Sequence, residues 1–352
     1  MSKYLIIIQH STIEAAQSST FTVIRACRSP VKVIRPENRQ HRTLTTPTTT
    51  TPETQSLYAT NRAVMSISPT TVVVTGASRG LGLAIVRELA TRPPLEPLMI
   101  YACCRSPSSV KPSPPINPSS NASLQWATLD TTDPSSISDL ASYIRQQCPQ
   151  GVDVLINNAG VNLDIENPHN ISTSARTLET NYDGPLRMTQ AFLPLMRTGD
   201  GTDSRIVNVS SVGSKLSNIP SAALRTRIRH AATLAEVASL RDSYLSSVRS
   251  GTEAQDGWPT GKAYSVSKAL LNAQTQVLAS ENDGVLVNAC CPGWCDTDMG
   301  GLIGGKPSKT TAEGARIPLR LAFGEVGGVS GEYWENERVS DTGSGRPSDW
   351  ME

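Results

Sequence analysis

The sequence is poor in aromatic side chains and has almost no excess of charge of either sign. Among its 352 residues, Phe, Trp and Tyr make up 5%, hydrophobic residues make up 38%, and the formal net charge at pH 7 is +1. The modest hydrophobic content indicates that part of the chain does not contribute to a packed core. A net charge this small argues against general affinity for nucleic acid or anionic membranes, so we expect neither as a partner.

Long apolar runs and paired cysteine motifs are also missing. No run approaches the ~20 apolar residues needed to cross a bilayer, so we expect no membrane span. Seven cysteines occur, but none forms a C-x-x-C motif or clusters with histidine, which argues against zinc and predicts no metal site. Free thiols fit a reducing compartment such as the cytoplasm.

Residues 1–64 differ in composition from the rest of the chain. A Thr/Pro tract at 43–56 cannot bury a core and predicts disorder. Basic residues outnumber acidic ones around it, as in mitochondrial import segments. Two interpretations stay open: a non-functional extension ahead of an alternative start at Met65, or a targeting segment that would make the protein mitochondrial. In either case we expect a single folded domain over residues 65–352.

From residue 70 onward, short β-branched runs alternate with segments of helical periodicity. This alternation predicts an α/β fold of Rossmann type, a doubly wound parallel sheet with helices on both faces and ligands bound at the carboxyl ends of its strands. Five prolines between residues 106 and 122 exclude a regular helix after the second strand, so we expect a loop there. Strands are predicted at 71–76, 97–104, 124–130, 152–160, 205–211 and 284–293, and helices at 81–90, 133–147 and 175–196. Asp133 followed by Pro134 predicts the capped start of the second of these helices.

The first predicted strand runs into the segment TGASRGLG, residues 75–82. Its glycines have the spacing G-x-x-x-G-x-G between a strand and a helix. Small residues at this place let the backbone approach a pyrophosphate at a helix N-terminus, where the helix dipole favours an anion. We therefore predict a dinucleotide site. The cofactor contacts predicted in this loop are Gly76, Ser78, Arg79, Gly80, Leu81 and Gly82.

The charge at the end of the second strand indicates which dinucleotide is bound. An NAD site would need an acidic residue about 20 positions after the glycine loop to bind the free ribose hydroxyl. Here the strand ends in CCRS, with Arg105 at that place. Together with Arg79 this puts two arginines where a 2′-phosphate would lie, which favours NADP(H) over NAD. Either arginine alone is equally compatible with a solvated surface side chain.

Tyr264 and Lys268 stand four positions apart in a segment of helical periodicity, so they share one face of the helix. Such pairs are common on protein surfaces and prove nothing alone. The other interpretation is that the lysine cation stabilises the phenolate, drawing a phenol pKa of about 10 toward neutral pH. Ser211 and the glycine loop accompany the pair, and they favour this second interpretation.

Five motifs occur in one order: TGASRGLG (75–82), NNAG (157–160), Asn181 in LETNYDG, Ser211 in VNVSS, and Tyr264-x-x-x-Lys268. The same motifs occur in the same order in the short-chain dehydrogenase/reductase family, which the sequence resembles over roughly residues 70–340. The segments GWP…AYSVSK, NACCPGW and TDM further resemble the monomeric carbonyl reductases of that family.

The resemblance implies NADPH-dependent reduction of aldehydes, ketones or quinones by direct hydride transfer. Tyr264 would be the general acid and Ser211 a second donor to the substrate oxygen. Lys268 would also bind the nicotinamide ribose, and Asn181 would hold a water. Trp294 would lie beside the substrate, or else be a core aromatic. The further cofactor contacts implied are Asp130, Asn157, Gly160, Pro292, Gly293 and Thr297.

Residues 212–263 separate Ser211 from Tyr264, far more than in ordinary members of the family. Most of the excess is helix-prone, which predicts a helical insertion at about 212–256. The resemblance implies that this insertion covers the face on which other members associate, which would make the enzyme a monomer. A peripheral insertion without effect on assembly is the alternative.

Other activities stay open. Oxidation of a secondary alcohol with NAD would need the acidic residue that is missing after the second strand. A protein that binds NADP without turnover, or an epimerase or dehydratase, could share the fold. Cys290 and Cys291 read as buried small side chains. Cys295 falls in a loop near the cofactor, and modification of its thiol stays open as an alternative.

Overall fold

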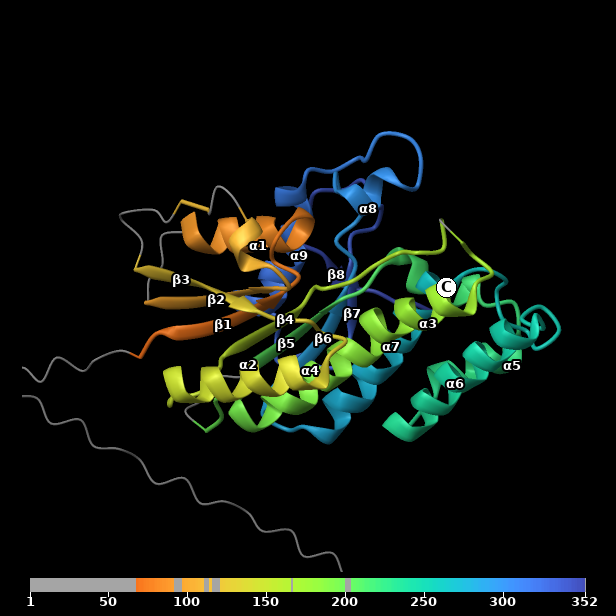
Figure 1. The fold of residues 1–352 in the computed structure, drawn as a ribbon, viewed down its shortest axis with the longest axis horizontal. Helices are drawn as coiled ribbons and strands as arrows, with labels where there is room; N and C mark the ends of the chain where they lie inside the picture. Colours follow the sequence, from red (N-terminus) through yellow and green to blue (C-terminus); the bar gives the residue numbers. More distant parts are fainter. Residues whose placement is uncertain are drawn as a thin grey trace, which may run out of the picture. The chain divides into compact units, whose positions relative to one another are not determined.

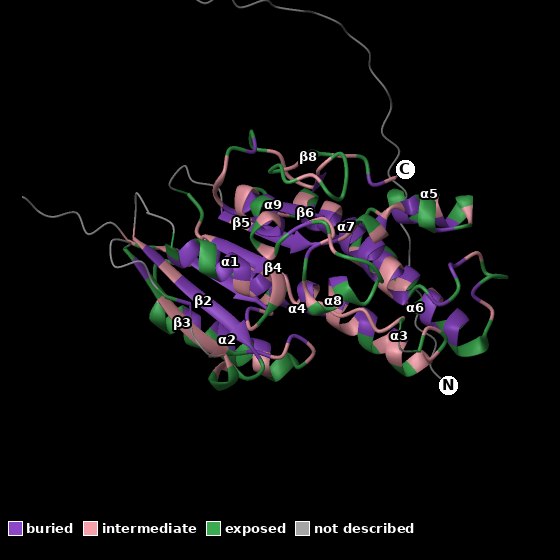
Figure 2. Cartoon of the chain, turned by 90° about the horizontal axis from the view of Figure 1, so that it is seen from above, coloured by how far each residue is buried: buried purple, intermediate pink, exposed green. Residues whose placement is uncertain are grey.

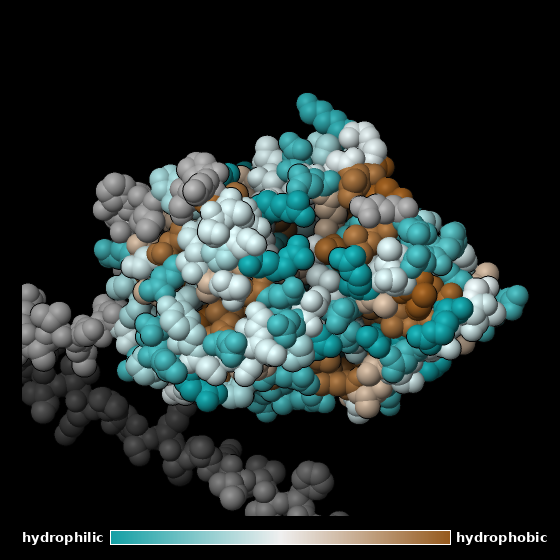
Figure 3. Space-filling model, viewed as in Figure 1, coloured by the Kyte–Doolittle hydropathy of each residue, from teal (hydrophilic) through white to brown (hydrophobic). Residues whose placement is uncertain are grey.

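The computed structural model describes residues 68–91, 97–110, 114–115, 121–165, 167–199 and 204–351. The predictions for residues 1–64 and for a start at Met65 lie outside these ranges. Within them, no helix combines the length and the apolar character that crossing a bilayer requires. Hydrophilic side chains cover most of the face seen in Figure 3, with apolar patches between them.

The described residues form one sheet in the order β3-β2-β1-β4-β5-β6-β7-β8 (Figure 1). Neighbours from β3 to β7 pair in parallel, and β8 pairs antiparallel with β7. The strand order reverses between β1 and β4, the kind of switch point at which such sheets bind ligands. The strands are β1 Thr70–Thr75, β2 Leu98–Cys104, β3 Ala122–Thr128, β4 Val154–Asn157, β5 Ser204–Val209, β6 Val285–Cys290, β7 Tyr333–Glu335 and β8 Arg346–Pro347.

Helices cover both faces of this sheet (Figure 1). Helices α1 (Gly80–Thr91) and α9 (Thr311–Phe323) lie on one face, and α2 (Pro134–Gln147), α4 (Gly184–Phe192) and α7 (Ala263–Glu281) lie on the other. Successive strand residues point to opposite faces. Val72 and Val74 therefore join the core under α1 and α9, and Val73 joins the core under α2 and α4. The predicted doubly wound α/β fold is confirmed.

Local signals predicted the start of α2 correctly. Asp133 is its N-cap and accepts a hydrogen bond from the backbone N–H of Ser135 at 2.9 Å, with Pro134 in the first turn. The crossover from β2 to β3 is different: its described residues contain one 3₁₀ turn, η1 (Pro107–Ser109), and no α-helix. Leu124 and Trp126 on β3 are accordingly only partly buried.

The helix predicted over 175–196 is divided in the structure. Helix α3 (Ile171–Leu178) passes into a π-helical turn, η2 (Glu179–Asp183), before α4 and a 3₁₀ turn, η3 (Leu193–Leu195), complete the segment. Single π-turns inside α-helices often occur at functional sites. Here the wide turn contains Asn181, one of the predicted catalytic residues.

The insertion before Tyr264 is helical, as predicted. Two 3₁₀ turns, η4 (Val212–Ser214) and η5 (Leu216–Asn218), lead into α5 (Ala222–Arg229) and α6 (Leu234–Ser250). Val237, Leu240 and Tyr244 of α6 share a buried cluster with Val266 and Leu270 of α7. Figure 2 shows buried residues on the inner side of these helices and exposed ones on the outer side. The insertion therefore covers α7, and its effect on oligomeric state stays a prediction.

Candidate active site

The glycine loop between β1 and α1 folds as tightly as its sequence indicates. Gly76 has a left-handed backbone, with φ +65°, and a Cβ there would lie 2.8 Å from the Cα of Ala159. A Cβ on Gly82 would overlap the carbonyl oxygen of Gly76. The loop brings the N-terminus of α1 to the carboxyl edge of the sheet. This tight turn, here called the cradle, therefore requires glycine at both positions.

Asn158 braces this loop, a role that the sequence did not predict. Its side-chain amide donates to the carbonyl oxygens of Thr75 and Gly76 at 2.9 and 3.2 Å. The Thr75 hydroxyl in turn accepts from the backbone N–H groups of Asn158 and Ala159, both at 3.0 Å. The NNAG motif contains Asn158, but the motif does not say which of its two asparagines faces the loop.

Asn157, the predicted cofactor residue of that motif, points the other way. Its side chain is buried and donates to Asn208 Oδ1 at 2.9 Å and to the Thr189 hydroxyl at 3.3 Å. These partners lie on β5 and α4. Because neighbouring residues of an extended chain face opposite ways, only one of the two asparagines can turn toward the glycine loop.

Gly160, Asn181 and Lys268 meet at the end of β4. A Cβ on Gly160 would lie 3.2 Å from Asn181 Oδ1 and 3.5 Å from Lys268 Nζ. The Asn181 amide accepts from the Val161 N–H at 2.9 Å and donates to the Val161 carbonyl at 2.8 Å. It also donates to the Ser267 hydroxyl on α7 at 3.0 Å. The π-turn thus ties the loop after β4 to the helix that carries Tyr264 and Lys268.

Lys268 is buried, with 4% of its surface exposed, and its Nζ donates to the carbonyl oxygen of Val209 at 2.7 Å. Burial lowers the Lys268 pKa to about 8, because removal from water disfavours the ammonium form. The Nζ atom lies 6.0 Å from the centroid of the Tyr264 ring. The lysine and the phenol are therefore neighbours on one face of α7, as their spacing predicted.

Ser211 and Tyr264 also come together. Both flank Gly213, whose Cβ, if present, would lie 3.5 Å from the Ser211 hydroxyl and 3.6 Å from a ring carbon of Tyr264. Burial raises the Tyr264 pKa to about 12, and a hydrogen bond with Ser211 opposes that rise. The lowered phenol pKa that we expected from Lys268 is not found in this structure. Desolvation of the phenolate is the largest cause of the raised pKa, and the Lys268 Nζ is hydrogen-bonded to the Val209 carbonyl instead.

The first turn of α7 is capped by a residue far away in sequence. Lys262, at the N-cap position, makes no side-chain capping bond. Instead Asp164, in the loop after β4, accepts from the Tyr264 backbone N–H at 2.9 Å. A carboxylate at this place satisfies a helix N–H group and complements the helix dipole. No local sequence signal marks Asp164, since its partner is a hundred residues away.

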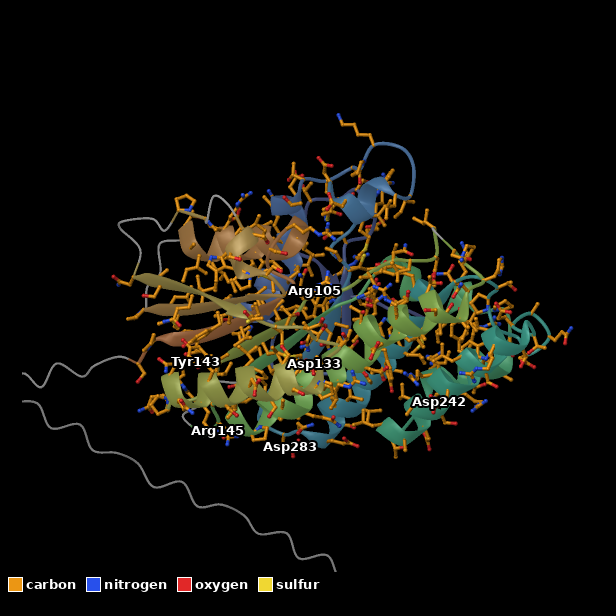
Figure 4. The ribbon with its side chains drawn as sticks, viewed as in Figure 1. Arg105, Asp133, Tyr143, Arg145, Asp242 and Asp283 are labelled. Carbon is orange, nitrogen blue, oxygen red and sulfur yellow. The ribbon has the colours of Figure 1, made fainter. Side chains whose placement is uncertain are left out.

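The two arginines predicted to bind a 2′-phosphate have different surroundings. Arg79 forms an ion pair with Asp298 at 2.8 Å, with 77% and 75% of the two side chains exposed. Asp298 begins α8 (Asp298–Gly301), in the loop after β6. Arg105 is exposed at the carboxyl end of β2, near the centre of Figure 4. The Arg79–Asp298 pair was not predicted, and it joins the glycine loop to α8.

Asp130, at the end of β3, lies near Arg105. Burial acts to raise the Asp130 pKa, but bonds from the Thr132 N–H at 2.9 Å and hydroxyl at 2.7 Å, with the charge of Arg105, outweigh it. The pKa of Asp130 is therefore lowered and the side chain is ionised at neutral pH. One of its oxygens is committed to Thr132.

The loop after β6 reaches across to the glycine loop. The Pro292 carbonyl accepts from the buried Lys309 Nζ at 2.8 Å. Gly293 is left-handed, with φ +86°, and a Cβ on Gly80 would lie 3.2 Å from the Thr297 methyl group. Trp294 donates from its indole N–H to the Gly300 carbonyl at 2.9 Å. Its partner thus lies within its own loop, and a substrate role for Trp294 stays a prediction.

The cysteines near this loop are poor candidates for thiol chemistry. Cys290, Cys291 and Cys295 are all buried, and burial raises the pKa of each thiol, that of Cys295 to about 11. Reactive cysteines are accessible and have lowered pKa values. The structure therefore argues against modification of Cys295. Among the described residues, no three His, Cys, Asp or Glu side chains are grouped so as to hold a metal ion.

Comparison with known proteins places this geometry in a family. Residues 70–223 match the family model described as short chain dehydrogenase, and residues 243–329 match the one described as Enoyl-(Acyl carrier protein) reductase. "Short-chain dehydrogenase/reductase 1" of Saponaria officinalis is 33% identical over 292 residues, covering 76% of this chain and 94% of that protein. Human "Carbonyl reductase [NADPH] 1" is 31% identical over 278 residues, covering 76% of this chain and 96% of that protein.

Solved structures agree with the sequence relatives. Salutaridine reductase from Papaver somniferum superposes with a TM-score of 0.62 at 26% identity, over 75% of this chain and 99% of that one. NADPH-bound carbonyl reductase from chicken fatty liver superposes with a TM-score of 0.54 at 26% identity, over 76% and 96%. The chain therefore belongs to the short-chain dehydrogenase/reductase family, of which it is a carbonyl reductase-like member.

Proposed function

We propose that this protein is an NADP(H)-dependent oxidoreductase that reduces the carbonyl group of aldehydes, ketones or quinones. The observation that carries the proposal is the meeting of Ser211, Tyr264, Lys268 and Asn181 at one edge of the sheet, beside the glycine loop. The relatives named as NADPH carbonyl reductases support the substrate class and the cofactor.

The site fits a dinucleotide on the chemistry of its own residues. The tight turn at Gly76 and Gly82 brings the N-terminus of α1 to the carboxyl edge of the sheet, where a pyrophosphate would bind. Arg105 and Arg79 are the cations for a 2′-phosphate. Bound NADPH would supply the hydride to the carbonyl carbon. Asn157 can contact the cofactor only through its backbone, because its side chain faces the core. The other proposed contacts are Ser78, Gly80, Leu81, Asp130, Gly160, Pro292, Gly293 and Thr297.

Tyr264 is suited to donate a proton to the carbonyl oxygen. With a pKa near 12, its phenol is fully protonated at neutral pH, which is the form that a general acid needs. Ser211 adds a second hydrogen bond to the oxygen as negative charge develops there. Almost none of the phenol is ionised at neutral pH, so little phenolate is present to accept a proton in the opposite direction.

Lys268 and Asn181 support the phenol and do not act on the substrate directly. The ammonium group of Lys268 stabilises the phenolate left after proton transfer. Asn181 adjoins Lys268 across Gly160 and ties the loop after β4 to α7. In this arrangement Lys268 lies next to the phenol and can return a proton to the phenolate. Asn181 holds the loop after β4 in place beside Lys268.

The test is consumption of NADPH, followed at 340 nm, with an activated dicarbonyl or a quinone. We expect Tyr264→Phe to lose about 10²- to 10⁴-fold in kcat, because it removes the proton donor. Tyr143→Phe is the matched control, since this tyrosine is 43% exposed on α2, away from the carboxyl edge (Figure 4). Retention of most of the activity by Tyr264→Phe would contradict the mechanism. Tight NADPH binding without turnover across a broad carbonyl panel would favour a non-catalytic binding protein instead.

We also propose that the protein is a monomer of 37.6 kDa. The supporting observation is that α5 and α6 bury apolar residues against α3 and α7, so this face is covered by the chain's own insertion. Light scattering coupled to size exclusion would measure the mass. A dimer mass at micromolar concentration would overturn the proposal.

A further inference from the structure

A cavity of about 580 Å³ lies next to the catalytic pair. Val212 and Gly213, which follow Ser211, and Ser265, which follows Tyr264, are among its lining residues. Gly213 adjoins both the Ser211 hydroxyl and the Tyr264 ring. A substrate with its carbonyl oxygen at Ser211 and Tyr264 would therefore have this cavity beside it. The volume suits a small organic molecule, since ligand pockets measure about 300–1,000 Å³.

The lining combines apolar surface with two cationic side chains, more charge of one sign than most small-molecule pockets carry. Two lysines, Lys215 and Lys262, line it, and no acidic residue does. The other polar side chains of the lining are those of Ser217, Asn218, Thr260 and Ser265.

Two carboxylates interact with these lysines, and both have other partners. Glu335 lies 3.1 Å from the Lys215 Nζ and also accepts hydrogen bonds from Tyr333 and Ser348 at 3.1 and 2.9 Å. Asp164, on which the charge of Lys262 acts, accepts from the Tyr264 N–H at the start of α7. Glu335 anchors Lys215 in one place, which reduces the entropy lost when that lysine binds an anion.

We propose that this cavity selects carbonyl substrates that carry a carboxylate, which Lys262 and Lys215 bind while Ser211 and Tyr264 hold the carbonyl oxygen. The inference rests on the proposed carbonyl reduction and adds its substrate class. Lys262 contributes more to the preference for a carboxylate than Lys215 does. It is exposed at the N-terminus of α7 and forms no ion pair within 4.0 Å among the described residues. Lys215 divides its charge between the substrate and Glu335.

The sharpest test compares two aldehydes that differ only in charge, 4-carboxybenzaldehyde and methyl 4-formylbenzoate, with NADPH. The wild-type protein is expected to have a KM about tenfold lower for the carboxylate, and added salt should raise that KM alone, since screening weakens exposed charge pairs. Lys262→Gln should raise the KM for the carboxylate about tenfold and leave the ester unchanged. Lys262→Arg should restore the preference, because it retains the charge.

Two further variants make the test specific. Arg145→Gln removes a cation from the last turn of α2, away from the cavity (Figure 4), and should change neither KM. Lys215→Gln combined with Glu335→Gln removes both charges of the pair, so that no buried carboxylate is left alone. This double variant should raise the KM for the carboxylate a further few-fold. Equal KM values for the two aldehydes in the wild-type protein would overturn the inference, as would an equal effect of Lys262→Gln on both.

A binding measurement separates this inference from the proposed function. Calorimetry with 4-carboxybenzyl alcohol in the presence of NADP⁺ should give a Kd that rises about tenfold in Lys262→Gln. If neither aldehyde is reduced but this Kd still depends on Lys262, carbonyl reduction is wrong and the carboxylate site stands. If the Kd does not depend on Lys262, the carboxylate site is wrong even where both aldehydes are reduced.

Discussion

The proposed cofactor half of the site and its proposed catalytic half are built in different ways. In the glycine loop the backbone is proposed to bind the cofactor, and its tight turn comes from glycines close in sequence, such as Gly82 against Gly76, although Asn158 braces the loop from the end of β4. The catalytic half depends on side chains from distant segments, such as Lys268 on the Val209 carbonyl and Asp164 on the Tyr264 amide. The difference shows that backbone sites follow from local sequence, whereas the chemistry of buried side chains follows from what is packed around them.

Removing the Lys268 cation should have the largest effect on kcat, because the charge lies next to the proposed proton donor. Lys268→Met retains the length of the side chain but loses the charge that stabilises the phenolate. We expect kcat to fall about 10²- to 10³-fold, as for loss of one preorganised electrostatic group. NADPH affinity, measured by fluorescence titration, should fall much less. Equal losses in kcat and affinity would mean that the lysine acts only as a cofactor ligand.

The pH dependence of kcat also tests whether the charge of Lys268 is needed. The Lys268 pKa is about 8, so the group is charged below that pH and neutral above it. The Tyr264 pKa is near 12, so the phenol stays protonated throughout the assay range. We therefore expect kcat for reduction to fall as the pH rises through about 8. Lys268→Met should lack this inflection, and a wild-type profile that stays flat to pH 10 would contradict the assignment.

A change in the backbone cradle should break the cofactor half selectively. Gly82→Ala places a Cβ against the Gly76 carbonyl, so the turn must open. We expect the NADPH Kd to rise about tenfold, which corresponds to about 1.4 kcal/mol, together with a loss of about 1–3 kcal/mol in folding stability. The control is Gly301→Ala, where a Cβ would meet nothing within 4 Å. Unchanged NADPH affinity in Gly82→Ala would show that the cradle does not hold the pyrophosphate.

Loss of the remote cap should have a smaller effect on both stability and rate. Asp164→Ala leaves the Tyr264 N–H without its acceptor, and loss of a helix cap costs about 1 kcal/mol. We expect the midpoint of thermal unfolding to fall by a few degrees and kcat to fall several-fold, with NADPH affinity unchanged. Asp164→Asn, which retains an acceptor, should recover most of both. A drop in NADPH affinity equal to the drop in kcat would place Asp164 in the cofactor half instead.

The smallest effect is expected at the Arg79–Asp298 ion pair. Both side chains are mostly exposed, and such pairs are worth about 0.2–1 kcal/mol. Asp298→Asn releases Arg79 for the 2′-phosphate, so the Kd for NADPH should fall up to about fivefold while that for NADH stays the same. Asp296→Asn, an exposed neighbour, is the control. An equal gain for NADH would show that Arg79 does not recognise the 2′-phosphate.

The parts of the fold that were predicted correctly depend on local signals. Six strands, the Asp133 cap of α2 and the helical insertion follow from periodicity, capping residues and glycine spacing within short windows. Strands β7 and β8 were missed because segments of two or three residues carry no periodicity. The helix predicted at 175–196 was wrong in its continuity, since nothing in the local sequence marks the π-turn at Asn181.

The sequence by itself determined the doubly wound sheet, the glycine cradle and the spacing that puts Tyr264 and Lys268 on one face of α7. Only the tertiary structure decided that Asn158 rather than Asn157 braces the cradle, that Asp164 caps the catalytic helix, and that Arg79 is paired with Asp298. It also decided that the Tyr264 pKa is raised and not lowered. The physical reason is that periodicity and backbone fit act over a few residues, whereas burial and charge act between groups that meet only after folding.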